Sequence, residues 1–242
     1  VAVDGAAWEQ RFVNTYSPVF SPDSSTVAAQ IRTDICEYSI ASDGQSWANR
    51  FGCVWEPLFK PDGSGIVAPV RSDGKWTLAE DGTPIWGRYA QLWHLRPSPD
   101  GSRLAAVAAP EFGRWTIAAD DTPWPARFSD MVLPPVFSPD GKRVAAIVKD
   151  RGSWSIAVDG IPWKQKLDMV WDPVFSPCGT HVLAKAKTDA GFRLIVDDRL
   201  CRAPFEMLWD PVLSADGEKL LLRHVTEGKY CREVLTFREI LG

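Results

Sequence analysis

The feature of the sequence that most constrains the fold is an internal repeat. A turn motif related to Pro-x-x-Ser-Pro-Asp-Gly occurs six times, and successive copies begin 39, 38, 40, 38 and 38 residues apart. Six such units account for nearly the whole chain of 242 residues, which predicts one repetitive domain over residues 1–242. The copies are PVFSPDS from Pro18, PLFKPDG from Pro57, LRPSPDG from Leu95, PVFSPDG from Pro135, PVFSPCG from Pro173 and PVLSADG from Pro211.

Each unit contains four short runs that are typical of β-strands. A run of small apolar residues follows the turn, as in TVAAQI from Thr26, and an aromatic residue opens the next run, as at Trp76. An Asp-Gly turn and a second tryptophan then follow, as at Asp81 and Trp86. Because β-branched and aromatic runs between Asp, Gly and Pro turns indicate antiparallel strands, we expect four strands per unit. We also expect strand in the last dozen residues.

Four strands at a period near 40 residues are the signature of a β-propeller blade. We therefore predict an all-β fold, a six-bladed β-propeller of four-stranded antiparallel blades. The N-terminal VAVDGAAW is similar to IAVDGIPW at Ile156–Trp163, and the last unit, from Pro211, supplies only three strands. We expect the N-terminal strand around Trp8 to complete the last blade and close the ring, which removes exposed strand edges.

The repeat carries a family resemblance. Its Ser-Pro-Asp-Gly turn after an apolar strand resembles the repeat of TolB-like and WD-repeat-like propellers, although Trp171-Asp172 and Trp209-Asp210 precede the first strand, where a WD repeat does not place them. The motifs Val-Asp-Gly-x-x-Trp and Trp-Asp-Pro-Val-Phe-Ser-Pro most closely resemble the TmcD family, the tryptophan-rich subunits of the Tmc transmembrane electron-transfer complex of sulfate-reducing bacteria. The resemblance implies a cytoplasmic, cofactor-free subunit that docks onto redox partners, and it supplies no catalytic residues.

Charge and cysteine usage exclude several classes of partner. The formal net charge of −4 argues against a nucleic-acid partner, which needs a basic surface to replace counterions. No apolar run approaches the 18 residues of a membrane helix, so we expect no direct membrane insertion. The cysteines are odd in number and form no CxxC pair, which favours free, mostly buried thiols in a reducing compartment over a disulfide framework. They are Cys36, Cys53, Cys178, Cys201 and Cys231.

The common motifs of catalysis and cofactor binding do not occur in the sequence. We find no GxSxG, HExxH, GxxxxGK[ST] or GxGxxG pattern. The histidines His94, His181 and His224 occupy unrelated repeat positions, which argues against a preassembled triad or metal cluster. We therefore expect a chain that is not an enzyme and binds no metal or cofactor. We interpret the repeated turn aspartates as turn chemistry: Asp23, Asp62, Asp100, Asp140 and Asp216.

Two of the three tryptophan registers are predicted to have structural roles. Trp76, Trp115 and Trp154 open the third strand and are expected to fill space between blades. A second register starts the outermost strand, with a basic residue two or three positions later. An amphipathic strand with a solvated charge is the favoured interpretation, and a cation–π contact is the alternative. The pairs are Trp8 and Arg11, Trp47 and Arg50, Trp86 and Arg88, Trp124 and Arg127, and Trp163 and Lys166.

The third register, called the inner register below, is the candidate functional surface. It consists of Trp55, Trp93, Trp171 and Trp209, with Tyr16 and Leu133 in the remaining units, and stands just ahead of the innermost strand. In a blade wound outward from the axis, this connection opens at the mouth of the central channel. The next residue varies among the repeats, as expected for a site grafted on a common scaffold. The predicted binding residues are Trp55, Glu56, Trp93, His94, Trp171, Asp172, Trp209 and Asp210.

The alternative for the inner register is that its tryptophans pack sideways between blades while the acids only solvate the rim. Large aromatic residues ringed by charge suit a protein interface. The leading hypothesis is therefore a non-catalytic interaction subunit that binds protein partners, such as subunits of a membrane redox complex. A carbohydrate-binding or small-ligand-binding propeller is the second hypothesis. A hydrolase with its site at the channel mouth is the third, weakened by the missing motifs.

Overall fold

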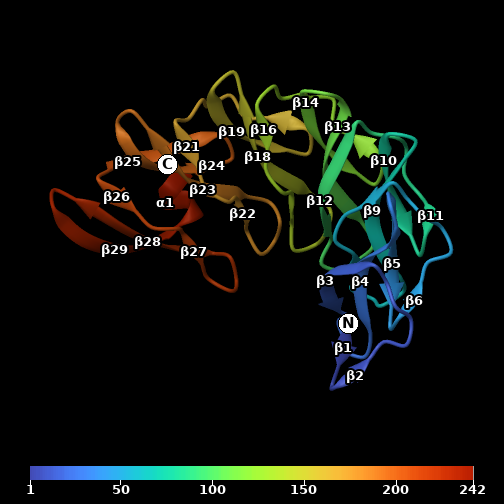
Figure 1. The fold of residues 1–242 in the computed structure, drawn as a ribbon. Helices are drawn as coiled ribbons and strands as arrows, with labels where there is room; N and C mark the ends of the chain where they lie inside the picture. The colour runs from blue at the N-terminus through green and yellow to red at the C-terminus, as the bar shows by residue number, and fades with distance from the viewer. Residues whose placement is uncertain (242) are drawn as a thin grey trace. The chain divides into compact units, whose positions relative to one another are not determined.

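The computed structural model describes residues 1–241 and consists of short strands joined by tight turns (Figure 1). Val1–Phe112 with Ala118–Pro123 form one compact unit, called unit 1, and Gly113–Ile117 with Trp124–Gly242 form unit 2. Within residues 1–241 the secondary structure is almost entirely strand, and one short helix ends it. The predicted all-β class is confirmed.

Unit 1 begins with a two-stranded sheet and continues with antiparallel sheets. β1 (Ala2–Val3) pairs with β2 (Ala6–Ala7). The first repeat sheet has the order β3 (Asn14–Phe20), β4 (Val27–Asp34), β5 (Glu37–Ser42), β6 (Gln45–Ser46). In the second, β7 (Cys53–Val54) and β8 (Leu58–Phe59) both pair with β9 (Ile66–Ser72), followed by β10 (Lys75–Glu80) and β11 (Thr83–Pro84). In the third, β12 (Gln91–Pro97) pairs with β13 (Leu104–Glu111). The end of β14 (Arg114–Ala119) that belongs to unit 1, Ala118 and Ala119, pairs with β15 (Thr122–Pro123).

Unit 2 repeats the same plan. In the fourth sheet, β16 (Met131–Val132) and β17 (Val136–Phe137) pair with β18 (Val144–Asp150), followed by β19 (Ser153–Val158) and β20 (Ile161–Pro162). In the fifth, β21 (Met169–Val170) and β22 (Val174–Phe175) pair with β23 (Val182–Thr188), followed by β24 (Gly191–Val196) and β25 (Arg199–Phe205). In the last, β26 (Met207–Leu208), β27 (Val212–Leu213) and β29 (Lys229–Thr236) all pair with β28 (Lys219–Thr226).

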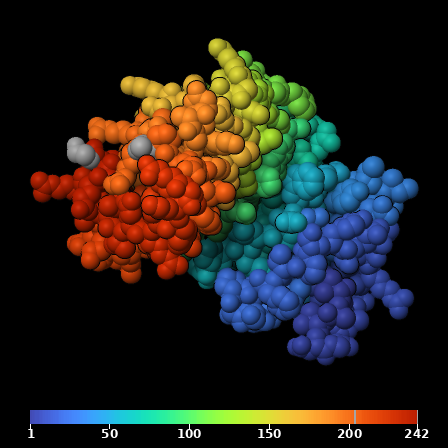
Figure 2. Space-filling view, turned by 90° about the vertical axis from the view of Figure 1, so that its left-hand side faces the viewer, coloured from blue at the N-terminus to red at the C-terminus, as the bar shows by residue number. Residues whose placement is uncertain are grey.

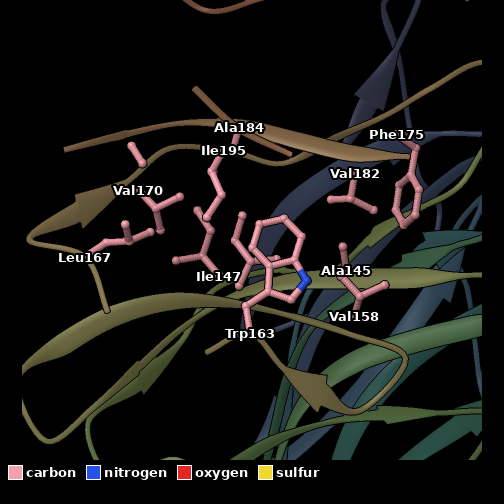
Figure 3. Packing of buried hydrophobic residues seen from close by; sticks show 12 residues of the cluster. Ala145, Ile147, Val158, Trp163, Leu167, Val170, Phe175, Val182, Ala184 and Ile195 are labelled. Carbon is pink, nitrogen blue, oxygen red and sulfur yellow. The ribbon is translucent and has the colours of Figure 1, made fainter. Parts of the chain in front are cut away.

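The sheets have the strand order of propeller blades, and the last one supplies its first three strands, as the sequence predicts. Second strands can be largely buried, as in β9, where residues 66–70 are all buried, and in β18, where residues 144–148 are all buried. Within each unit, apolar side chains of successive sheets pack against one another. Figure 3 shows one such layer in unit 2, in which Trp163 packs among Ile147, Val170 and Ile195 of the fourth and fifth sheets. Closure of six blades into one ring remains a prediction.

The turn aspartates form local hydrogen bonds, which confirms their interpretation as turn chemistry. The Asp23 carboxylate accepts hydrogen bonds from the Ser21 hydroxyl at 2.6 Å and from the Ser25 N–H at 3.1 Å. Asp100 has the same two partners, at Ser98 and Ser102. These bonds fix the loop between the first and second strands in the two repeats, and they stabilise the ionised carboxylate.

Two sequence-based expectations are wrong. The chain leaves the strand conformation at its end, where α1 (Phe237–Leu241) follows β29. Thr236 and Glu239 cap this helix reciprocally, since Glu239 N–H donates to Thr236 Oγ1 and Thr236 N–H donates to Glu239 Oε2. The thiols are also not mostly buried. All five are free, but only Cys201 is buried, because the others lie at turns and sheet edges.

Within residues 1–241, no helix has both the length and the apolar character needed to cross a membrane.

Candidate functional site

The inner register interrupts the innermost strand, and does not stand ahead of it as the sequence suggested. β7 ends at Val54 and β8 begins at Leu58, yet both pair with β9, so Trp55 and Glu56 lie in the gap of a single broken strand. In the third sheet β12 is continuous, but its register against β13 shifts between Trp93 and Arg96. An extra residue in one strand bends it locally and turns side chains out of the sheet, an arrangement found next to functional sites.

The backbone at this break keeps one ladder bond and then leaves the sheet. The Trp55 N–H donates to the Pro69 carbonyl at 2.9 Å, and Trp171 makes the equivalent bond to Lys185 at 3.0 Å. The next residue adopts a left-handed conformation in two repeats, with φ of 47° at Ser17 and 53° at His94. Such angles are unfavourable for residues with a β-carbon, and they occur often at binding and catalytic sites.

In unit 1 the inner-register residues of three successive sheets line a single pocket, called the unit 1 pocket. Its volume is about 680 Å³. The structure thereby brings together four of the eight predicted site residues, Trp55, Glu56, Trp93 and His94. It adds residues that the predicted set omitted, although Tyr16 and Ser17 could have been found from their repeat position. The added residues include Tyr16, Ser17, Gln30 and Arg96.

The aromatic walls of this pocket are partly exposed. Trp55 is 45% exposed, and one face of its indole stacks on Trp76 with ring centroids 5.4 Å apart and an interplanar angle of 9°. Trp76 itself is buried, as expected for its register, and so supports the exposed ring. Tyr16 is 42% exposed. The N-terminal part of unit 1, drawn in the darkest blue in Figure 2, is exposed over most of residues 1–20.

The charged side chains that line the unit 1 pocket, Glu56 and Arg96, are both exposed. The Ser17 hydroxyl donates to Glu56 Oε1 at 3.4 Å, which places the carboxylate against the register shift between Tyr16 and Val19 in the first sheet. Partial burial, followed by the charge of Arg96, lowers the pKa of His94, whereas Glu56 acts in the opposite direction. His94 is therefore favoured as a neutral imidazole, and Arg96 supplies positive charge beside it.

In unit 2 two of the predicted residues, Trp171 and Asp210, contact a lysine that sequence reasoning missed. The Lys185 ammonium lies 4.4 Å from the centroid of the Trp171 ring and 2.8 Å from Asp210 Oδ1. Trp209 meets Tyr230 edge-on, with ring centroids 5.5 Å apart, and Asp172 is exposed. The signal that could have identified Lys185 is its position opposite Trp171 in the second strand, which is uncharged in four of the six repeats.

The outer-strand register differs from expectation in part. Trp47, Trp124 and Trp163 are buried, and the guanidinium groups of Arg50 and Arg127 donate to the carbonyl of the tryptophan three residues earlier. These charges are therefore used to satisfy backbone acceptors in addition to being solvated. The tryptophans of this register pack against the next repeat and are mostly buried. The inner register is therefore the more accessible set of aromatic residues.

The remaining histidines form separate local contacts. His224 is buried, with Nε2 3.1 Å from Glu233 Oε1 and Nδ1 3.0 Å from Thr226 Oγ1, in a second pocket of about 450 Å³ in unit 2. His181 Nδ1 lies 2.5 Å from Asp197 Oδ2. Among the described residues, no group of three or more His, Cys, Asp or Glu side chains is arranged to hold a metal ion.

Neither a protein-family model nor a curated protein sequence matches the chain. Solved structures are similar to it. A eukaryotic initiation factor has 15% identity and a TM-score of 0.53 over 97% of this chain and 67% of its own. The β-propeller domain of the Trilobed protease from Pyrococcus furiosus has 12% identity and a TM-score of 0.47, over 93% of this chain and 82% of its own. TolB from Acinetobacter baumannii has 17% identity and a TM-score of 0.41 over 90% of this chain. The chain spans only 56% of that TolB structure. At these identities the likeness concerns the fold alone.

Proposed function

We propose that this chain is a non-catalytic interaction subunit that binds another protein through its inner register. One observation carries the proposal: Tyr16, Trp55 and Trp93, from three successive sheets, line one pocket. Large, partly exposed aromatic side chains with a polar rim are the typical centre of a protein interface, because they bury much area at little cost in side-chain entropy. Trp171 and Trp209 extend the proposed set in unit 2.

The proposed setting is the cytoplasmic side of a membrane redox complex, in which the chain is an accessory subunit. The support for this is the tryptophan-rich repeat, which resembles the TmcD family. The net charge of −4 supports a protein partner over a nucleic acid. In this proposal the chain binds its partner without inserting into a membrane and holds no cofactor of its own.

We also propose that the six sheets close into one propeller. The support comes from apolar side chains that are exposed on the first and last sheets. Phe20 is 60% exposed, whereas its repeat equivalent Phe175 is 6% exposed, and Val234 on β29 is 64% exposed. Exposed apolar side chains at positions that are more buried in other repeats are expected where a further sheet packs. The N-terminal strand around Trp8 then supplies the missing fourth strand of the last sheet.

Affinity capture tests the interaction proposal. The full chain is immobilised, an extract of the source organism is passed over it, and bound proteins are quantified by mass spectrometry. We expect a partner whose recovery falls at least about fivefold with Tyr16→Ala or Glu56→Ala, because the substituted side chains are exposed and their loss should leave the fold intact. Arg50→Ala and Lys166→Ala, in the segments that follow the outer strands β6 and β20, are the controls and should capture the partner normally. Loss of capture by these two variants alone would contradict the proposal.

The same aromatic pocket supports a second candidate, a carbohydrate-binding or small-ligand-binding propeller, since exposed rings such as Trp55 can stack on sugars. A glycan array distinguishes the two. Oligosaccharide binding that Tyr16→Ala abolishes, together with no captured protein, would favour the second candidate. A hydrolase remains the third candidate and would require turnover of an ester or peptide substrate that Glu56→Gln abolishes.

A further inference from the structure

In unit 2, an aromatic ring of the inner register and an acid of the next repeat together bind a lysine ammonium group. The Lys185 ammonium lies over the Trp171 ring and pairs with Asp210, the residue that follows the inner-register position of the next repeat. The Lys185 side chain is only 14% exposed. A partly desolvated ammonium gains from both a cation–π contact and a charge-assisted hydrogen bond. The chain thus fills this place with a cation of its own.

Unit 1 repeats the ring and the acid but not the cation. Strand register makes Tyr16 the equivalent of Trp171, because Tyr16 pairs with Gln30 on the second strand as Trp171 bonds to Lys185. Gln30 is therefore the counterpart of Lys185. An aromatic inner-register residue followed by an acid in the next repeat occurs at Tyr16 with Glu56 and again at Trp171 with Asp210. Tyr16, Gln30 and Glu56 all line the unit 1 pocket.

The charges around the unit 1 pocket favour a cation at one end of it. Glu56 lies against the first sheet, as its 3.4 Å contact with the Ser17 hydroxyl shows. Arg96 lies beside His94, on the third sheet, and repels a second cation there. A positive charge is therefore best accommodated between Tyr16 and Glu56, where the acid attracts it and an exposed ring face can cover it.

We propose that the unit 1 pocket binds a lysine side chain of the partner protein, with its ammonium over the Tyr16 ring and paired with the Glu56 carboxylate. The bound lysine takes the place that Lys185 fills in unit 2. This inference rests on the proposed function, because it names the chemistry that the partner presents to the site.

The test uses the full chain and a peptide probe, acetyl-Gly-Gly-Lys-Gly-Gly-amide, with calorimetric titration. A peptide in which norleucine replaces lysine is the matched control, since it keeps the aliphatic stem and removes the charge. We expect the lysine peptide to bind at least about tenfold more tightly, and Glu56→Gln to abolish most of that difference. Asp189→Asn, which changes an exposed acid of unit 2 outside the inner register, should leave peptide affinity unchanged. Equal binding of the two peptides by the wild-type chain would overturn the inference.

The second test introduces a positive charge into the unit 1 pocket by substitution. Gln30→Lys places an ammonium at the repeat position of Lys185, so it should fill the site from within and weaken the lysine peptide at least about tenfold. Gln30→Met, of similar size and uncharged, should bind the peptide normally. Thermal melting confirms that both variants fold, and Gln30→Lys should not melt below wild type. Normal peptide binding by a folded Gln30→Lys chain would overturn the inference.

The two proposals fail in different ways. A captured partner that depends on Tyr16, together with no preference for the lysine peptide, would support the interaction function and overturn the lysine inference. A lysine peptide that binds through Glu56, together with no captured protein, would support the lysine site and overturn the interaction function.

Discussion

Gly82 lies directly against the Trp47 side chain, so that a β-carbon at residue 82 would be 3.1 Å from the Trp47 β-carbon. Gly44 and Trp8 have the same relationship, as do Gly160 and Trp124. The glycine belongs to the Asp-Gly turn of one repeat, and the tryptophan belongs to the outer strand of the preceding repeat. The absence of a side chain at this turn therefore lets successive sheets pack closely along their outer strands.

Gly82→Ala should destabilise the chain more than the same change at Gly74. Both glycines have positive φ, 86° and 76°, which makes alanine unfavourable by about 1–2 kcal/mol at either position. No atom lies within 4 Å of a β-carbon at residue 74, whereas a β-carbon at residue 82 would be in close steric contact with Trp47. Overpacking should add about 1–3 kcal/mol at Gly82 alone. Urea denaturation measures the difference, and equal losses would contradict the packing role of the glycine.

The Asp23 carboxyl should titrate well below the ordinary range. The hydrogen bond from the Ser21 hydroxyl, followed by those from Ser25, lowers the pKa of Asp23 to about 2. Because the folded pKa is depressed, stability from this carboxylate is present above its ordinary pKa and is lost as pH falls toward 2. Carbon-detected NMR titration should give a midpoint near 2 that rises in Ser21→Ala and rises less in Ser25→Ala. An unchanged midpoint in Ser21→Ala would be the contrary result.

Cys178 should be the reactive counterpart of the turn aspartates, since it occupies their place in PVFSPCG. Contacts with the hydroxyls of Ser176, at 3.4 Å, and Thr180, at 2.9 Å, lower the pKa of the Cys178 thiol to about 7. Burial raises the pKa of the Cys201 thiol. Because the thiolate is the nucleophile, iodoacetamide at neutral pH should alkylate Cys178 well before Cys201. Peptide mass spectrometry measures both rates, and Ser176→Ala should slow only the first.

Asp210 and Asp172 should differ in their contribution to stability, although both are exposed acids that directly follow an inner-register tryptophan. Asp210 pairs with Lys185 at 2.8 Å, and the ammonium is largely covered. Among residues 1–241, Asp172 forms no salt bridge. Asp210→Asn should therefore lower the free energy of unfolding by roughly 0.5–1 kcal/mol, and Asp172→Asn by less than about 0.5 kcal/mol. Chemical denaturation of the two variants makes the comparison, and high salt should reduce the gap.

If the ring closes, the N-terminal strand should stabilise the fold by pairing with the last sheet, in addition to the packing of Trp8. Deletion of residues 1–13 removes β1 and β2 together with the Trp8 contact on Gly44. Trp8→Ala removes that contact but keeps the backbone that would pair with the last sheet. If the ring closes, the deletion should lower the melting temperature clearly further than Trp8→Ala does, because it opens an unpaired edge. Equal melting temperatures of the two variants would contradict closure.

The sequence by itself determined the local architecture. Turn residues at fixed offsets, such as Asp23 with Ser21, organise their own hydrogen bonds, so each repeat carries its strand boundaries in a few adjacent positions. Four strands per repeat follow from these turns and from the alternation of apolar residues between them. The same reasoning placed Trp55 and Trp93 in one register, because a period of about 39 residues brings equivalent positions to equivalent places.

Tertiary structure alone decided how those registers are used. The break in the innermost strand at Trp55 depends on how β7 and β8 pair with β9, and the residues next to Trp55 do not predict that pairing. The Lys185 contact with Trp171 and Asp210 joins two repeats and a second strand, so it exists only once the sheets have packed. The turn to helix after Thr236 has a local signal in the reciprocal Thr236 and Glu239 cap, but the burial of Ile240 that accompanies it depends on tertiary packing. Local hydrogen bonds can be read from adjacent residues, whereas contacts between repeats depend on packing geometry that a linear pattern does not specify.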